Sequence, residues 1–396
     1  MAYGDTGHDE ALRTAWHAFC DRLKDVGELV FADPAPATPL ERAVGLQYVA
    51  RNISAGLEIG LEHADPLYPQ LFRMMAPNRK RGGDNPDCVY FLGIIDGSET
   101  YRLVGNRGSA HFIAFSAVRP LETIPEGEAA EVGRLLGDEL ETEWDGSFVV
   151  TVSPEPHPGN WVRTTPEVDK VWVRQFYGDW NREQPMDVRI ERVGAEGPPP
   201  RLTPERLAAG LEAAVDELHE TVDYWRGWQE HYRAQPNRFL ESPTARKLGA
   251  APGGLPQHVY FMVQPDEALL IEFTPPECSY WNFELNTYWM TSIDYRYHLS
   301  SINGSQAVLE EDGSVILVVA HDDPGVPNWL ATDGHCEGHI GLRWMQADSQ
   351  PTPATRLVKL ADLPSALPPG ARRIDEAGRR EQLRLRRIGV DRRFRI

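Results

Sequence analysis

The densest group of side chains that could carry chemistry lies at residues 334–339, which read GHCEGH. On a strand, His335, Glu337 and His339 would share one face, because side chains alternate along a strand. Two imidazoles and a carboxylate are the ligand set of non-haem iron sites, and they also suit zinc. Four residues of strand separate the two histidines by about 13 Å, which is too far for one metal ion to bind all three side chains. We therefore predict a metal set of His335 and Glu337 completed by His321 from another strand.

The same residues could perform acid–base chemistry without a metal. His335 or His321 would be the general base, oriented by Glu337 or by an acid of the HDDPG stretch at 321–325. The predicted catalytic residues are His335, Glu337, His321 and Arg343, with either no cofactor or one divalent metal ion. A structural alternative stays open, in which His335 caps a strand turn and HDDPG is turn chemistry.

A second polar group precedes this cluster, in the segment SYWNFELNTYWMTSIDYRYH at 279–298. On a strand its residues alternate between an apolar face and a polar face, and the polar face could line a cleft. Aromatic rings beside amides and carboxylates suit a polyhydroxylated or amphiphilic small molecule. An ordinary solvent-facing side of a sheet would show the same pattern. The residues predicted to bind substrate are Glu284, Asn282, Asn286, Trp289 and Tyr295.

Composition restricts the class of protein. The 396-residue chain has a net charge of −19, so neither nucleic acid nor an anionic membrane is expected to bind its body. We expect no secretory signal and no membrane span, because the first thirty residues are polar and the apolar runs have strand length. The four cysteines form no CxxC pair, and neither GxGxxG nor a P-loop occurs; NRKRGGDNPD at 78–87 is glycine-containing but precedes no helical pattern. A cytoplasmic protein that acts on a small molecule is the expectation.

The C-terminal segment departs from this acidic balance. Residues 371–396 contain ten arginines against four acids. Because the rest of the chain is acidic, we expect this tail to pack on its own body or on a neighbouring subunit. A homo-oligomer therefore remains open.

Two strand-rich regions resemble each other in an ordered series of motifs. Asp145-Gly146-Ser147 matches Asp312-Gly313-Ser314, Asn160-Trp161 matches Asn328-Trp329, and Arg174 matches Arg343. Val-Tyr-Phe occurs upstream of both, at 89–91 and 259–261. Features shared by the two copies are expected to be structural: DGS as a turn, Asn-Trp as a loop lock, and the arginine paired with a carboxylate. The histidines belong to the second copy alone, which favours a functional role for them.

The elements that would position these residues follow from periodicity. Apolar residues every three or four positions predict an N-terminal helix with a stripe from Leu12 through Trp16 to Val30. TPLE at 38–41 predicts a second helix with Thr38 as cap and Glu41 closing a capping box, and Thr203 caps a third. The fold class is mainly β with flanking helices (α+β), as two related antiparallel β-sandwiches of jelly-roll type. The predicted segments are 1–80 (helical), 85–195 (first sandwich), 197–238 (linker and amphipathic helix), 240–362 (second sandwich) and 363–396 (arginine-rich tail).

The second half also resembles the domain-of-unknown-function 1214 family of bacterial proteins. The resemblance is carried by PPECSYWNFELNTYWMTSIDYRYHLSSIN at 275–303, HDDPGVPNWLATDGHCEGHIGLRW at 321–344 and GGDNPDCVYFLGIIDG at 82–97. It implies paired sandwiches of jelly-roll type and supplies no established activity.

Two functions fit these observations. The first is an enzyme, a hydrolase or lyase, that acts on a carbohydrate-like or amphiphilic small molecule by acid–base or metal-assisted chemistry in a cleft of the second sandwich. The alternative is a non-catalytic protein that binds carbohydrates or other small molecules.

Overall fold

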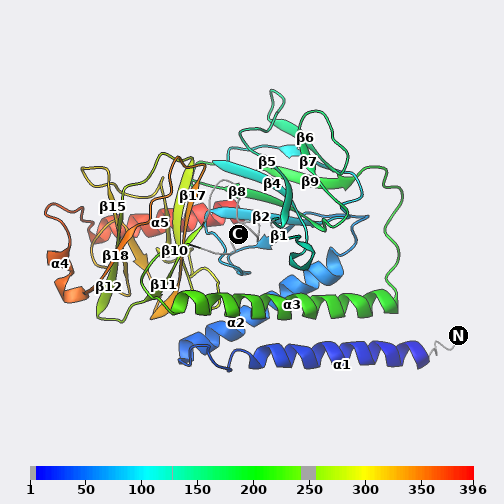
Figure 1. The fold of residues 1–396 in the computed structure, drawn as a ribbon, viewed down its shortest axis with the longest axis horizontal. Coiled ribbons are helices and arrows are strands. Elements are labelled where there is room, and N and C mark those ends of the chain that lie inside the picture. Colours follow the sequence, from blue (N-terminus) through cyan, green and yellow to red (C-terminus); the bar gives the residue numbers. More distant parts are fainter. Residues whose placement is uncertain (1–5, 127, 242–255) are drawn as a thin grey trace.

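Two β-sandwiches lie side by side above a layer of three helices (Figure 1). The computed structural model describes residues 6–126, 128–241 and 256–396. Each sandwich pairs a five-stranded sheet with a four-stranded sheet. The expected fold class is confirmed, with one difference: β6–β7 and β15–β16 pair parallel, while the other strand pairs of the described sheets are antiparallel.

The first sandwich has the strand orders β1-β2-β8-β4-β5 and β7-β6-β3-β9. Its core fills the space between the two sheets with residues such as Phe115 and Val150. β1 lies within the N-terminal segment that was expected to be helical. The bounds are β1 (Phe72–Met75), β2 (Cys88–Ile94), β3 (Tyr101–Asn106), β4 (Phe112–Val118), β5 (Glu131–Leu136), β6 (Ser147–Ser153), β7 (Trp161–Arg163), β8 (Lys170–Phe176) and β9 (Asp187–Arg192).

The second sandwich repeats this arrangement strand for strand, with the orders β10-β11-β17-β13-β14 and β16-β15-β12-β18. Its core is richer in aromatic rings, among them Phe283 and Trp344. The bounds are β10 (Leu240–Glu241), β11 (Gln257–Met262), β12 (Glu267–Phe273), β13 (Tyr280–Asn286), β14 (Ser301–Asn303), β15 (Val315–Ala320), β16 (Trp329–Ala331), β17 (Glu337–Met345) and β18 (Ala354–Lys359). The shared strand order supports the duplication that the motifs indicate.

The shared motifs have the structural roles expected of them. Asn328 accepts a hydrogen bond from the Val308 amide at 2.8 Å and donates one to the Val308 carbonyl at 2.7 Å. Asn160 makes the same pair of bonds to Glu141, each at 2.8 Å. In both copies the following indole donates to a backbone carbonyl of the preceding strand. The Asn-Trp pair therefore locks one loop onto each four-stranded sheet.

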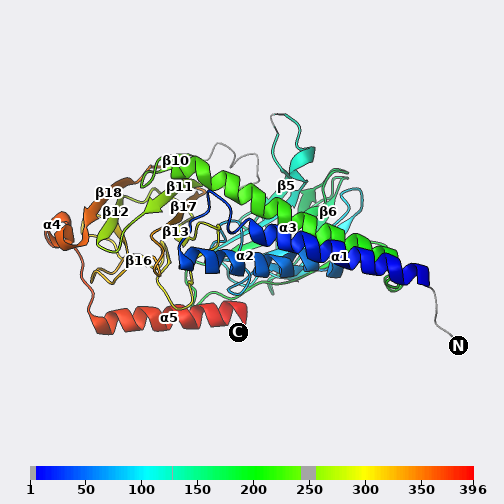
Figure 2. The same cartoon turned by 90° about the horizontal axis from the view of Figure 1, so that it is seen from below.

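The helical layer consists of α1 (Thr6–Glu28), α2 (Pro39–Leu57) and α3 (Pro204–Arg233). α2 continues into one turn of π-helix, Glu58–Glu62, and short 3₁₀ turns occur at Leu121–Thr123 and Leu360–Asp362. Figure 2, seen from below, shows these three helices side by side in front of the sheets. Trp16 is 53% exposed, so the predicted apolar stripe of α1 is buried only in part.

Thr38 caps α2 as predicted, since its hydroxyl accepts a hydrogen bond from the Glu41 amide at 3.2 Å. The predicted capping box is not closed by Glu41. Its carboxylate turns instead toward the second sandwich, where it meets His335.

The arginine-rich tail folds back on the body. It forms α4 (Leu363–Ala366) and α5 (Glu376–Phe394), and α5 runs along the lower edge of the molecule in Figure 2. Val390 and Phe394 join the core of the first sandwich. Arg379 forms a two-pronged ion pair with Asp323 of the second. The tail therefore packs on its own body, which is the first of the two environments expected for it.

Candidate functional site

His335 lies in the turn that precedes β17, where the chain reverses at Asp333 and Gly334, both with positive φ. The ring is buried, and its Nδ1 lies 2.5 Å from Glu41 Oε1 of α2. The other carboxylate oxygen, Glu41 Oε2, has no hydrogen-bond partner among the described residues. With Nδ1–H donating to Glu41, the Nε2 atom of His335 is left as the proton acceptor, which is the arrangement of a histidine general base.

The other predicted catalytic residues have separate partners. Glu337 accepts a hydrogen bond from the Tyr260 hydroxyl at 2.7 Å and pairs with Arg233 of α3 at 3.1 Å. His321 Nε2 lies 3.0 Å from the Val263 carbonyl. Thus His335, Glu337 and His321 are not brought together as the predicted ligand set.

No group of three or more His, Cys, Asp or Glu side chains within residues 6–126, 128–241 and 256–396 is arranged as metal ligands. His339 of β17 faces His258 of β11. The Nε2 atom of His339 lies 2.8 Å from the Nδ1 atom of His258. The rings of Trp228 and Tyr232 enclose this pair. The two imidazoles therefore belong to the packing of α3 on the sheet.

The alternation predicted for β13 is correct. Trp281, Phe283 and Leu285 lie in the core of the second sandwich, and Asn282 and Glu284 face the other way. That polar face is not solvent-exposed, however: Asn282 is 0% and Glu284 1% exposed. It is covered by the first sandwich and by residues 78–87, so it forms a buried interface.

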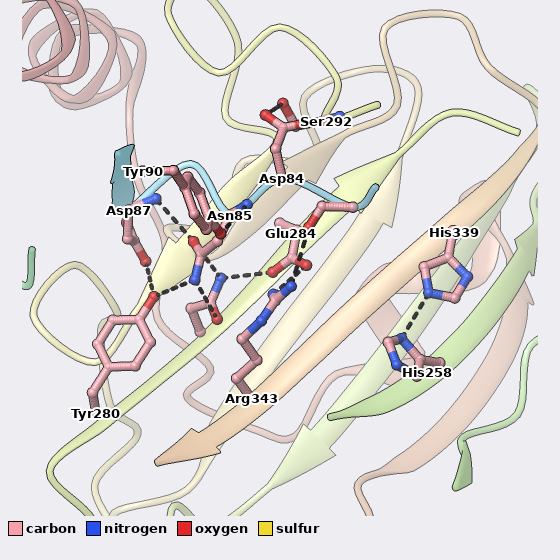
Figure 3. A network of polar contacts seen from close by, with 12 residues as sticks. Asp84, Asn85, Asp87, Tyr90, His258, Tyr280, Glu284, Ser292, His339 and Arg343 are labelled. Carbon is pink, nitrogen blue, oxygen red and sulfur yellow. Dashed lines mark hydrogen bonds and ion pairs between the residues drawn. The ribbon is translucent and has the colours of Figure 1, made fainter. Parts of the chain in front are cut away.

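Figure 3 shows the network at this interface. Arg343 pairs with Glu284 Oε1 and donates to the Gly83 carbonyl at 3.1 Å. Asn282 donates to Glu284 Oε2 at 2.7 Å and to Asn85 Oδ1 at 3.1 Å. Burial raises the pKa of Glu284 to about 7, although Arg343 and Asn282 act against the rise. The expectation of a carboxylate partner holds for Arg343, whereas its counterpart Arg174 instead donates to Ser116 Oγ at 3.5 Å.

The segment NRKRGGDNPD supplies the opposite half of the interface. Asp87 accepts hydrogen bonds from the Tyr280 hydroxyl and from the Trp180 indole, both at 2.6 Å. Asp84 accepts from the backbone amide and the hydroxyl of Ser292, at 2.9 and 2.7 Å. The two bonds from Ser292 to Asp84 fix the loop after β13, and residues of this loop line the cavity described next.

A cavity of about 570 Å³ opens beside this loop, between α2, residues 77–80 and the turn that carries His335. Its volume is ordinary for a small-molecule site. Most of its lining residues carry a hydroxyl, an amide or a charge, and both signs of charge occur. The polar lining residues are Gln47, Arg51, Asn78, Lys80, Thr287, Thr291, Ser292, Asp294, Arg296, Tyr297, Asp333 and His335.

Two cations in this cavity form no contact ion pair with a carboxylate of the described residues, although Asp84 and Asp294 lie near enough to raise the pKa of both. Lys80 donates to the carbonyls of Ser292 and Ile293, at 2.8 and 3.3 Å, and lies 4.5 Å from the centre of the Tyr295 ring. Burial lowers the pKa of Lys80 to about 8. Arg51 makes no hydrogen bond or ion pair with the described part of the chain, and burial lowers its pKa as well.

None of the five residues predicted to bind substrate lines this cavity. Trp289 stacks on Tyr48 of α2 and donates its indole N–H to the Glu41 carbonyl at 3.1 Å. Tyr295 lies behind Lys80. Both support the wall from behind. Asn286 is fully buried on β13, and its amide has no partner among the described residues.

The sequence did not indicate Glu41, Lys80 or Arg51. Glu41 has the signature of a capping box, and Lys80 and Arg51 lie in an ordinary basic segment and on a helix. The Glu41 carboxylate contacts His335 instead of closing the cap at Thr38. That contact results from the packing of α2 on the second sandwich, which the sequence alone does not show.

Comparison with solved structures agrees with this fold. A crystal structure of an uncharacterized protein from Burkholderia cenocepacia is 36% identical, with a TM-score of 0.85, and the match covers 89% of this chain and 99% of that one. The family model described as "Protein of unknown function (DUF1214)" matches residues 266–348, from the start of β12 to just beyond β17. The chain belongs to the DUF1214 family.

The VPA0106 protein from Vibrio parahaemolyticus is 13% identical over 78% of this chain and 99% of its own, with a TM-score of 0.43. No curated protein matches the chain. Within the described residues of this DUF1214 member, the helices are all too short or too polar to span a bilayer.

Proposed function

We propose that this DUF1214 protein is an enzyme that binds a small, hydroxylated, acidic molecule in the cavity beside the second sandwich and acts on it by acid–base chemistry. The observation that carries the proposal is the His335–Glu41 pair in the cavity wall. Glu41 holds the ring through Nδ1, so Nε2 can take a proton from a bound molecule and return it. The reaction class is hydrolysis or elimination, since both need one such proton transfer.

The lining supports the class of ligand. Thr287, Thr291 and Gln47 offer hydroxyl and amide groups that suit a polyhydroxylated molecule. Arg51 offers a guanidinium that makes no hydrogen bond or contact ion pair with the described residues, which suits a carboxylate. A non-catalytic binding protein would need the same lining but would have no use for the His335–Glu41 pair.

Thermal unfolding with a small set of probes tests the proposal. Gluconate, glucuronate and glucose are added separately to the wild type and to His335→Gln, Arg51→Gln and the control His219→Gln, whose ring lies on α3 beside Asp223. We expect the two acids to raise the melting temperature of the wild type and the control, and Arg51→Gln to remove that rise. If none of the probes stabilises the wild type, or if Arg51→Gln keeps the full rise, the proposed ligand class is wrong.

Catalysis is then separated from binding. With a probe that binds, product formation is followed by proton NMR in the wild type and in His335→Gln. We expect the variant to turn over about a hundredfold or more slowly, as is usual when a general base is removed. Binding without turnover in the wild type would favour the non-catalytic alternative.

A further inference from the structure

Lys80 differs from the other lysines that the structure describes. Lys24 lies 2.8 Å from Asp21, Lys359 lies 2.9 Å from Asp266, and Lys170 pairs with Asp169. Each of these three ammonium groups is at least partly exposed and held by a carboxylate. Lys80 is 4% exposed and forms no ion pair with any carboxylate of the described residues. A carboxylate in contact with a lysine holds it in its protonated, unreactive form, and Lys80 alone among these four has no carboxylate in contact with its ammonium group.

The environment of Lys80 favours the neutral amine further. Its Nζ is bound only by the two backbone carbonyls and the Tyr295 ring. Asp84, Asp294 and Asp333 favour the charged form of Lys80, but burial outweighs them, and Arg51, which lines the same cavity, repels a second positive charge. Desolvation and a neighbouring cation are the two conditions under which proteins use lysine as a nucleophile.

We propose that Lys80 forms an imine with a carbonyl group of the molecule bound in this cavity, so that the ligand is a hydroxylated carbonyl compound that also carries a carboxylate. This inference rests on the proposed function and names the substrate class of the same site. Lys80 supplies the nucleophile and Arg51 binds the carboxylate. His335 supplies the base.

The step balances without a further reactant. The Lys80 ammonium group loses one proton, and the resulting amine adds through its nitrogen lone pair to the carbonyl carbon, forming the C–N bond as the C–O π bond opens. Proton transfer to the oxygen lets it leave as water, and a protonated imine remains. In sum, one ammonium group and one carbonyl compound give one protonated imine and one water, with no change of oxidation state.

The imine gives the His335–Glu41 pair a defined task. When Nε2 of His335 takes a proton from the carbon next to the imine, the electron pair left on that carbon moves toward the positive nitrogen. A hydroxyl on the following carbon then takes that proton back from His335 and leaves as water, while the enamine electrons form the new carbon–carbon double bond and restore the positive imine, which is an elimination. Between the two reaction classes proposed above, the imine selects elimination.

Borohydride trapping tests the assignment on the full-length protein. Pyruvate, a carbonyl compound with a carboxylate, and glyceraldehyde, one without, are each incubated with the protein and sodium borohydride at pH 8. Hydride reduces the C=N bond to a stable secondary amine, and peptide mass spectrometry locates the adduct. Because the pKa of Lys80 is about 8, its neutral fraction exceeds that of an ordinary lysine about a hundredfold.

We expect pyruvate to label Lys80 about tenfold or more over Lys24 and Lys359, which act as controls within the same digest. Lys80→Arg, which keeps the positive charge, should lose the adduct without gaining one elsewhere. Equal labelling of the three lysines, or no label at Lys80, would overturn the proposal.

Arg51→Gln tests the acid-binding part. We expect it to lower pyruvate labelling of Lys80 about tenfold and to leave glyceraldehyde labelling unchanged, because only pyruvate has a carboxylate to bind. An equal loss for the two probes would contradict this part. An unlabelled Lys80 in a protein whose turnover depends on His335 would overturn the imine alone. A labelled Lys80 with turnover independent of His335 would overturn the acid–base proposal alone.

Discussion

At the scale of single residues, the candidate site depends on side chains that are distant in sequence. His335 and Glu41 are 294 positions apart, yet their side chains lie 2.5 Å from each other. His335 could be singled out because the first copy of the duplication has a proline there. Glu41 could not, because its spacing from Thr38 satisfies a local helix motif equally well. Sequence patterns report local geometry, and a pair made by packing leaves no such pattern.

The His258–His339 pair makes stability depend on pH. Burial lowers the pKa of His339 to about 3, and burial together with His339 lowers that of His258 well below its usual range. Both rings are thus neutral in the folded protein, whereas the unfolded chain binds their protons as pH falls below about 6.5. The stabilising contribution is complete above that pH and declines toward pH 3. At pH 5 we expect a loss on the order of 2 kcal/mol per histidine.

Urea unfolding at pH 7.5 and pH 5 measures this loss. The double variant His258→Gln/His339→Gln should show a smaller change between the two pH values than the wild type. His219→Gln, a half-exposed site on α3, should show the wild-type change. A double variant that loses as much stability as the wild type would refute the role of the pair.

At the scale of elements, the duplicated motifs could be interpreted from sequence because each acts within its own strand and loop. The Asn-Trp pair bonds the backbone of the same sandwich in both copies. The polar face of β13 was expected to line a cleft or to meet solvent, and it is instead buried against the first sandwich. Alternation predicts which residues share a face, but whether that face meets solvent, a ligand or another sandwich depends on elements elsewhere in the chain.

Asn328 and Asn160 make the same contacts in the two copies, so they test how much burial adds to the stability that these contacts provide. Asn328 is 2% exposed and bonds three backbone groups, so Asn328→Ala leaves them unsatisfied away from water. We expect a loss of about 2–4 kcal/mol in the free energy of unfolding. Asn160→Ala should cost about 1 kcal/mol, because water can reach its partners. Equal costs in chemical denaturation would show that burial does not set the difference.

At the scale of the whole molecule, the two sandwiches meet through the outer faces of their five-stranded sheets. Tyr280 and Met345 of the second pack with Cys88, Tyr90 and Phe176 of the first. The duplication predicted two similar domains, and the structure confirms their shared strand order. How they meet could not be predicted, because residues 78–87, which lie between the two sheets, belong to neither set of shared motifs.

Arg343 and Glu284 test this interface. Arg343→Met leaves a buried carboxylate without its cation, and we expect a loss of about 3–5 kcal/mol in the free energy of unfolding. The double variant Glu284→Gln/Arg343→Met should recover most of that loss. Arg174→Met, the equivalent change in the first copy, should cost less because Arg174 has no carboxylate partner among the described residues. If the double variant is no more stable than Arg343→Met, the pair is not coupled.

The central claim is that His335, held by Glu41, exchanges protons with a molecule in the cavity, while the buried network around Glu284 is structural. Exchange of the methyl protons of pyruvate for deuterium in D₂O, followed by proton NMR, tests this most directly. We expect the wild type to accelerate the exchange, His335→Gln to reduce the acceleration about a hundredfold, and Glu284→Gln to retain it if folded. Wild-type protein that leaves the exchange at its buffer rate, or His335→Gln that exchanges as fast as wild type, would contradict the claim.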